Sequence, residues 1–275
     1  MSATTAATQV RAAGSPAVKR LIGGTVRPAT VVGAFPTALY LRLPGREVIA
    51  LLGRDAIRLP CGLVLPTTST EFPLSRLVGQ ALVGASTVRV GDWNVRLSHL
   101  VSPYAPTGLS PDHQAVEHAW RRLLTVECAD LGPELVGALL RDYQRPRVAS
   151  SLVDRLLGVG PGLTPAGDDV LAGLLVGARS FGLDADPLAG QVLGAAPHRT
   201  TDLSAALLRC ACRGEATSEL RALVSALAGS TAHRGQLDDA LAALRRVGHT
   251  SGEAMATGAT AAAAVALAHA GRGPA

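Results

Sequence analysis

The residue types that could do chemistry gather in one stretch of this chain, "LLGVGPGLTPAGDDVLAGLLVGA", over residues 156–178. Gly158, Gly160 and Gly162 alternate along it, and glycines at this spacing let the backbone take positive φ angles and approach a ligand closely. Thr164 is followed by a proline, a pair typical of a helix N-cap and first turn. A glycine-rich loop that leads into a helix N-terminus presents backbone N–H groups to an anion such as phosphate or carboxylate.

Two adjacent acids, Asp168 and Asp169, lie in the first turn and a half of this expected helix. Acids at this place stabilise the helix dipole by about 0.3–1 kcal/mol each when they are exposed. That role does not explain Gly167 beside them, because glycine inside a helix costs about 1 kcal/mol relative to alanine. We therefore interpret the aspartates as site residues that orient or deprotonate an N–H group of a substrate, or hold a Mg²⁺ ion. The alternative is an ordinary loop followed by a helix cap.

A second helix start, "GHTSGEAMATG", repeats this combination near the C-terminus. Thr250 and Ser251 are typical cap residues, and Thr250 and Glu253 have the spacing of a capping box. His249 is the side chain best able to move a proton there, and the alternative is a surface or capping histidine. We expect Thr250, Ser251 and Glu253 to contribute to substrate binding.

A third helix start, "HRTTDLSAALL", places Thr200 and Thr201 before a helix. By themselves these threonines are an ordinary N-cap. Arg199 beside them could supply a cationic anchor for a carboxylate or phosphate. If the three helix N-termini converge, they form one polar site in the helical part of the chain.

The elements that position these residues divide the chain into two parts. Short Val, Leu and Ile runs, such as "ALYLRL" and "EVIALLG", are separated by Gly or Pro about every ten residues and predict a meander or small barrel. "STVRVGDWNVRLS" predicts a β-hairpin that turns at Gly91–Asp92. The expected fold class is α+β. It has a disordered leader over residues 1–20, a β-rich domain over residues 21–106, and an α-helical domain over residues 107–275 with the glycine-rich loop and the acidic helix N-termini.

Helical patterns dominate the second part. Its first helix is expected to begin with Ser110 as the N-cap and Pro111 as the first helical residue. The C-terminal run is rich in alanine and too short to span a bilayer comfortably, so it predicts a buried helix. The apolar periodicity predicts helices over residues 111–125, 132–142, 149–157, 165–181, 186–195, 201–213, 217–228, 234–246 and 251–270.

The composition argues against several classes of function. The 275 residues carry a net charge of +5, 3% aromatics and four cysteines. Lys19 is the only lysine, and the P-loop string is absent, so a P-loop kinase and Schiff-base chemistry at the loop are excluded. The arginines are scattered without aromatic interleaving, which argues against nucleic-acid binding. No histidine or cysteine pair has zinc-ligand spacing, and the first residues lack the apolar core of a signal peptide, so we expect none. We expect a cytoplasmic protein with reduced cysteines, no membrane contact and no certain cofactor.

The three segments "LLGVGPGLTPAGDDVLAGLL", "HRTTDLSAALL" and "GHTSGEAMATG" together resemble a bacterial family of oxamate carbamoyltransferase subunits, formerly a domain of unknown function. The resemblance is strong at these segments and weak in the β-rich half. It implies carbamoyl transfer between carbamoyl phosphate and oxamate, giving oxalurate and phosphate, in purine (allantoin) catabolism. It also implies a complex with other carbamoyltransferase subunits. The family usually has aspartate where this chain has Glu253.

The resemblance and the residues suggest one division of roles. Gly160, Gly162 and Thr164 would bind the phosphate or carboxylate. Asp168 or Asp169 would orient or deprotonate the amide nitrogen, or hold a Mg²⁺ ion. Two alternatives stay open: a non-catalytic scaffold or regulatory subunit, and a stand-alone enzyme that acts on another amide, amine or phosphate ester.

Overall fold

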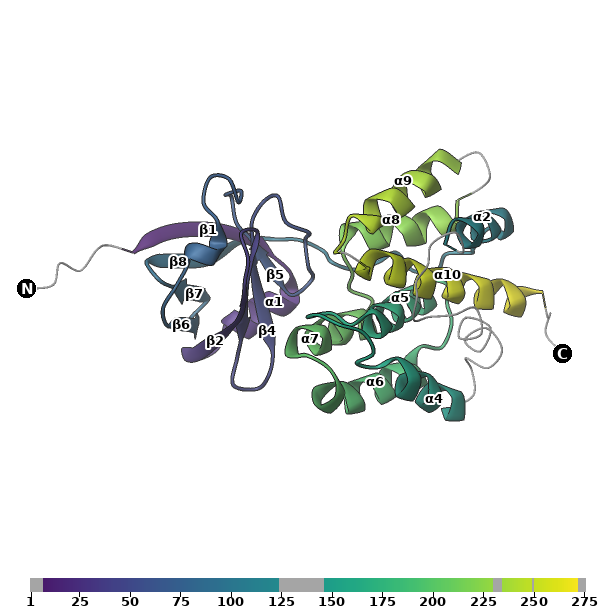
Figure 1. The fold of residues 1–275 in the computed structure, drawn as a ribbon, viewed down its shortest axis with the longest axis horizontal. Coiled ribbons are helices and arrows are strands. Elements are labelled where there is room, and N and C mark those ends of the chain that lie inside the picture. Colours follow the sequence, from purple (N-terminus) through teal and green to yellow (C-terminus); the bar gives the residue numbers. More distant parts are fainter. Residues whose placement is uncertain (1–6, 124–145, 230–233, 249, 272–275) are drawn as a thin grey trace, which may run out of the picture. The chain divides into compact units, whose positions relative to one another are not determined.

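The computed structural model describes residues 7–123, 146–229, 234–248 and 250–271 (Figure 1). The chain divides into two compact units, residues 1–103 and residues 104–275. We call the first the barrel unit, because its strands form a closed barrel, and the second the helical unit. A strand-rich part followed by a helical part confirms the α+β fold class. The division falls a few residues before the boundary expected at residue 107.

The barrel unit contains eight strands in the closed order β1-β5-β4-β3-β2-β6-β7-β8. Most neighbours are antiparallel, but β1 runs parallel to β8 and β4 runs parallel to β5. The interior is filled by aliphatic side chains such as Leu39, Leu41 and Val95, which are fully buried. The elements are β1 (Thr8–Gly14), α1 (Pro16–Ile22), β2 (Arg27–Ala34), β3 (Ala38–Arg42), β4 (Val48–Leu52), β5 (Gly62–Val64), the 3-10 helix η1 (Leu74–Arg76), β6 (Ala81–Gly84), β7 (Thr87–Val90) and β8 (Trp93–Leu100).

The prediction of a disordered leader over residues 1–20 is wrong for residues 7–20. Strand β1 pairs with β8 and closes the barrel, and α1 places Val18 and Ile22 in the barrel core. The small residues of β1 give a weak strand signal, so its pairing depends on partners about 85 residues away. Residues 1–6 lie outside the described part of the chain.

The predicted hairpin is confirmed. β7 and β8 pair as antiparallel neighbours from Val90 opposite Trp93 to Thr87 opposite Arg96. Gly91 at the turn has a φ of 57°, a conformation that glycine adopts at no steric cost. Alternation along the two strands buries Val88, Val90 and Val95, as a half-buried barrel wall requires.

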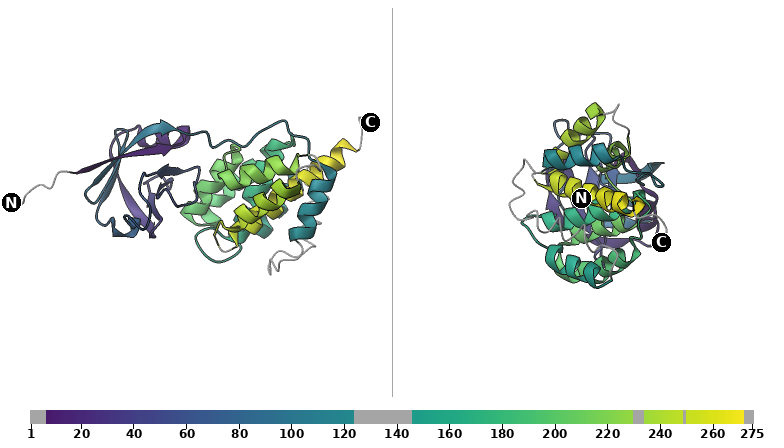
Figure 2. Two further views of the ribbon diagram at one scale, coloured as in Figure 1. Left: turned by 90° about the horizontal axis from the view of Figure 1, so that it is seen from above. Right: turned by 90° about the vertical axis from the view of Figure 1, so that its right-hand side faces the viewer.

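The helical unit is organised around α5 and α10, which pack along each other in its interior (Figure 2). Helices α2, α8 and α9 contact α10, whereas α4 and α7 contact α5 and α6 packs on α4 and α7. The helices are α2 (His113–Leu123), α4 (Pro146–Leu156), α5 (Ala166–Ser180), α6 (Asp186–Arg199), α7 (Asp202–Cys212), α8 (Ser218–Leu227), α9 (Arg234–Arg245) and α10 (Ser251–Ala270).

Glycines let α5 and α10 approach at backbone distance. A Cβ atom on Gly173 would overlap the carbonyl oxygen of Met255, and a Cβ on Gly258 would overlap that of Val170. Most residues of both helices are buried, which explains why α10 is apolar on all sides. No helix in the described part of the chain is long and apolar enough to cross a membrane.

The predicted helices are confirmed apart from their ends, except the one over residues 132–142, which lies outside the described residues. The start of the first helix is wrong by two residues. Helix α2 begins at His113, and Asp112 caps it by accepting a hydrogen bond of 2.8 Å from the backbone N–H of Ala115. Ser110 is therefore not the N-cap.

Candidate functional site

The glycine loop between α4 and α5, residues 158–165, has the backbone conformation that its sequence predicts. Gly160 and Gly162 have φ angles of 117° and 92°, which side chains with a Cβ rarely adopt. A Cβ on Gly162 would meet no atom within 4 Å, so this part of the loop is open to a ligand. At Gly158 a close contact also requires glycine, because a Cβ there would overlap the carbonyl oxygen of Arg199.

The loop presents backbone donors at the N-terminus of α5. Within the described part of the chain, the N–H groups of Gly160, Gly162 and Ala166 have no hydrogen-bond partner. The donors nearer the protein interior are occupied, since Gly167 donates to the carbonyl of Val159 over 2.9 Å. Free N–H groups beside the positive end of a helix dipole are suited to an anion.

Asp168 is completely engaged in holding the loop in place. Its side chain is 1% exposed. One carboxylate oxygen, Oδ1, accepts from the backbone N–H of Gly158 over 2.7 Å. The other, Oδ2, accepts from the hydroxyl groups of Thr200 and of Ser204, the latter over 2.6 Å. Asp168 therefore joins the glycine loop to the start of α7.

Asp169 lies in the opposite situation. Asp169 is 6% exposed, and its Oδ2 atom has no hydrogen-bond partner among the described residues. Burial raises the pKa of Asp169 to about 7, with a further contribution from the charge on Asp168, whereas hydrogen bonding by the Ser251 and Thr164 hydroxyls opposes the rise. A buried carboxyl with an unused acceptor oxygen can accept a hydrogen bond from an N–H group of a ligand. With a pKa near neutrality, it can also take up and release a proton.

The expected N-cap role of Thr164 is wrong. Pro165 occupies the cap position of α5, with no side-chain cap hydrogen bond. The Thr164 hydroxyl lies 3.0 Å from the hydroxyl of Ser251 at the start of α10. This contact brings the second helix start to the glycine loop.

The start of α7 also contacts the loop. Thr201 is the N-cap of α7, as expected: its hydroxyl oxygen accepts from the backbone N–H of Ser204 over 3.0 Å. The same hydroxyl donates to the carbonyl of Leu163 over 2.5 Å. Thr200 binds Asp168, so the three segments singled out by the sequence meet at one place in the helical unit.

The start of α10 differs from the predicted capping box. The Thr250 side chain makes no cap hydrogen bond, and Glu253 forms an ion pair of 3.0 Å with Arg245 instead. Gly252 is required for packing, because a Cβ there would overlap the carbonyl oxygen of Leu244. His249 lies outside the described residues.

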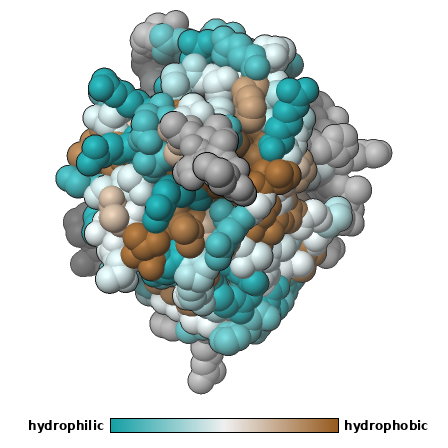
Figure 3. Space-filling model, turned by 90° about the vertical axis from the view of Figure 1, so that its left-hand side faces the viewer, coloured by the Kyte–Doolittle hydropathy of each residue, from teal (hydrophilic) through white to brown (hydrophobic). Residues whose placement is uncertain are grey.

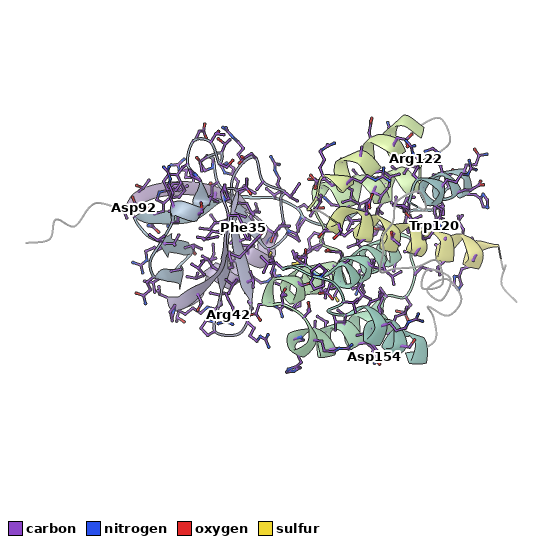
Figure 4. All side chains as sticks on the ribbon, in the orientation of Figure 1. Phe35, Arg42, Asp92, Trp120, Arg122 and Asp154 are labelled. Carbon is purple, nitrogen blue, oxygen red and sulfur yellow. The ribbon has the colours of Figure 1, made fainter. Side chains whose placement is uncertain are left out.

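Two residues taken as signs of the site have structural roles. Gly167 packs against the carbonyl of Leu156 on α4, and this contact explains a glycine in the first turn of α5. The Arg199 guanidinium binds Asp154, with 2.6 Å between Nη1 and Oδ1 (Asp154 is labelled in Figure 4). Arg199 is therefore paired at the surface and not held ready for an anion.

Sequence reasoning gave Ser204 no role at the site. It lies three residues after the cap residue Thr201 and is typical of the first turn of a helix, so nothing in the local pattern signals its bond to Asp168. Its buried position, 2% exposed, comes from tertiary packing.

The described residues contain no group of three or more His, Cys, Asp or Glu side chains arranged for a metal ion. Asp169 Oδ2 and the hydroxyl oxygens of Thr164 and Ser251 are hard oxygen atoms. Mg²⁺ is commonly held by one carboxylate together with substrate phosphate and water, so these residues fit an ion that arrives with a phosphorylated substrate.

Comparison with known families identifies one match. Residues 156–263 match the family described as oxamate carbamoyltransferase subunit AllH. The matched range contains all three segments that meet at the loop, which confirms the family suggested by their sequences. No curated protein and no solved structure matches the chain.

Proposed function

We propose, from the match of residues 156–263 to the oxamate carbamoyltransferase subunit family, that this chain is a subunit of such a transferase or an enzyme related to one. The proposal includes a small-anion site at the glycine loop and the cytoplasmic location expected from the sequence. The observation that carries the site is Asp169, a buried carboxyl whose Oδ2 atom is unpaired among the described residues.

In this proposal the backbone N–H groups of the loop bind the anion. Gly160, Gly162 and Ala166 offer N–H groups with no partner in the described chain. The phosphate of carbamoyl phosphate or the carboxylate of oxamate can accept from these groups without any lysine. In carbamoyl transfer the departing phosphate gains negative charge, and fixed N–H donors stabilise that charge most strongly in the transition state.

In this proposal Asp169 binds the amide group of oxamate. In the proposed reaction the oxamate nitrogen forms a bond to the carbamoyl carbon, and the bond from that carbon to the phosphate oxygen breaks. The nitrogen loses one proton, which Asp169 accepts and later releases. The raised pKa of about 7 matches this task, because a base whose pKa lies near the working pH is effective in both directions.

Asp168, Thr200 and Thr201 support this site indirectly. Their hydrogen bonds tie the loop to α7 and so fix the direction of the loop N–H groups. They are positioning residues in this proposal. Arg199 and Glu253 have partners of their own, so they contribute to the framework of the site.

The test is calorimetric titration of the purified chain with carbamoyl phosphate, phosphate, oxamate and oxalate, with and without Mg²⁺. Oxalate has nearly the shape of oxamate but no N–H group, so wild-type protein should bind oxamate at least tenfold more tightly. Asp169→Asn should abolish that preference. Asp92→Asn, the same change in the exposed turn after β7, is the matched control.

Each result decides between the open alternatives. Saturable binding followed by oxalurate formation supports a catalytic chain. Binding without turnover supports a subunit that needs partner subunits for catalysis. No binding of any of the four ligands overturns the anion site and favours a scaffold role.

A further inference from the structure

A charged feature of a different kind lies on the barrel unit. Strands β1, β8 and β7 are neighbours in the barrel, and their outward positions carry Arg11, Arg96 and Arg89, all exposed. The residues between them point into the core, as Val88 and Val95 are fully buried. We call these three arginines the arginine face. Figure 3 views the barrel unit from the side where β7 and β8 are labelled in Figure 1, and long hydrophilic side chains project from it.

The strand register places these positive charges close together. Arg11 on β1 lies directly opposite Arg96 on β8, at the strand spacing of about 5 Å. Arg89 on β7 lies opposite Asn94, two residues from Arg96 on the same face. Like charges directly opposite each other in a sheet are destabilising. The fold alone therefore does not favour this arrangement.

No acid of the described chain compensates the arginine face. Arg11, Arg89 and Arg96 form no ion pair or hydrogen bond with any described residue. Two of the four acids of the unit are engaged in a loop, where Asp55 binds Ser69 and Glu71 binds Thr68. In the sequence, the barrel unit has eleven basic and four acidic residues, whereas the helical unit has fifteen basic and seventeen acidic residues.

The groups between the arginines are polar and contain no aromatic ring. Gln9, Asn94 and Thr87 complete the two rows across the strands, and Asn94 donates to Gln9 over 3.0 Å. The nearby Trp93 is buried at 9% exposure and packs on Phe72. Without an exposed ring, the face offers no platform on which nucleic-acid bases could stack.

We propose that the arginine face is a docking surface for an acidic face of another protein chain. Carboxylates of the partner would lie between Arg11, Arg96 and Arg89, where guanidinium groups bind carboxylates in a bidentate manner. Gln9, Asn94 and Thr87 would hydrogen-bond the partner around them. This inference is independent of the proposed anion site, and a partner protein agrees with a family of subunits.

The first test is fluorescence anisotropy with labelled poly-L-glutamate as the acidic probe and poly-U RNA as the competing probe, over a range of salt concentrations. The full chain is compared with a triple variant, Arg11→Gln with Arg89→Gln and Arg96→Gln. The control removes the same charge from exposed arginines elsewhere in the barrel unit, by Arg20→Gln, Arg58→Gln and Arg76→Gln.

The triple variant should bind poly-L-glutamate at least tenfold more weakly than wild type, and the control variant less than threefold more weakly. Equal losses in the two variants would overturn the proposal, since net charge alone would then decide. Absence of wild-type binding at low salt would also overturn it. Tighter binding of poly-U, lost in the triple variant, would replace the protein partner by a nucleic acid.

A second measurement separates docking from folding. Arg96→Glu places a negative charge beside Arg11 and removes the like-charge contact, so its melting temperature should equal or exceed that of wild type. Its affinity for poly-L-glutamate should fall at least tenfold. A lower melting temperature with unchanged affinity would show that Arg96 serves the barrel and not a partner.

Discussion

Asp168 and Asp169 are adjacent in the chain, yet their carboxyl groups lie in two differently built regions of the helical unit. Around Asp168, the Gly158 N–H and the Thr200 and Ser204 hydroxyls satisfy both carboxylate oxygens. Around Asp169, burial leaves Oδ2 without a described partner. The hydrogen bonds of Asp168 join the glycine loop to the start of α7. The buried Oδ2 of Asp169 remains able to accept a hydrogen bond from a ligand, at a cost in stability. This difference separates a framework residue from a candidate site residue.

The largest effect is expected for Asp168→Ala. It leaves one N–H group and two hydroxyls without their acceptor in a buried place, so we expect a loss of about 4 kcal/mol in the free energy of unfolding. Urea denaturation measures it. Asp154→Ala removes an exposed ion pair with Arg199 and should cost less than about 1 kcal/mol. If the two variants were equally stable, the framework role of Asp168 would be wrong.

Asp169→Asn should stabilise the protein at pH 8. Its pKa is 3.8 without the folded surroundings and about 7 in the fold. The folded state therefore binds the proton more tightly, so the free energy of unfolding falls as pH rises from about 4 to about 7 and is level above. The pKa difference limits the effect to about 4 kcal/mol. Since the new amide must also be buried, we expect a gain of about 2 kcal/mol.

Thermal melts of wild type and Asp169→Asn from pH 4 to pH 8 measure this contribution. The wild-type curve should lose stability through this range, so the two proteins should be equally stable between about pH 5 and pH 6, and near pH 4 the variant should be less stable by about 2 kcal/mol. A variant that is less stable than wild type at pH 8 would show that Asp169 has a stabilising partner.

Gly162→Ala tests the loop that lies beside both aspartates. Its φ of 92° strains any residue with a Cβ, so we expect a loss of about 1 kcal/mol. Gly182→Ala is a matched control, because Gly182 has a φ of 72° and equally open space. Both variants should lose similar stability in urea, but Gly162→Ala alone should weaken phosphate or oxamate binding. Equal binding by both would exclude the loop from the ligand site.

The smallest effect is expected for Ser251→Ala. It removes the contact with Thr164 and one hydroxyl that lowers the pKa of Asp169, so that pKa should rise further from about 7. The cost in stability should be about 0.5 kcal/mol. The pH at which the stability curve becomes level should move upward, whereas Ser225→Ala on the exposed side of α8 should leave it unchanged.

The sequence by itself determined most of the helices and strands, though not β1 and α1, and it indicated the candidate site. Alternating Val88, Val90 and Val95 around Gly91 set the β7–β8 hairpin, since a strand in a barrel wall buries every second residue. Periodic apolar residues set the helices, and the glycine loop set the start of α5, because these signals are local. The family could also be predicted, since its motifs are continuous segments.

Only the tertiary structure decided which contacts each candidate site residue makes. The sequence pattern assigns Asp168 and Asp169 the same role. In the fold, Ser204 and Thr200, more than 30 residues away, bind Asp168, whereas Oδ2 of Asp169 has no partner among the described residues. The local pattern does not explain Gly167 in the first turn of α5, whereas the fold shows that it packs against the carbonyl of Leu156. Hydrogen bonds and close contacts between distant segments depend on how the helices pack, and one helix pattern is compatible with many packings.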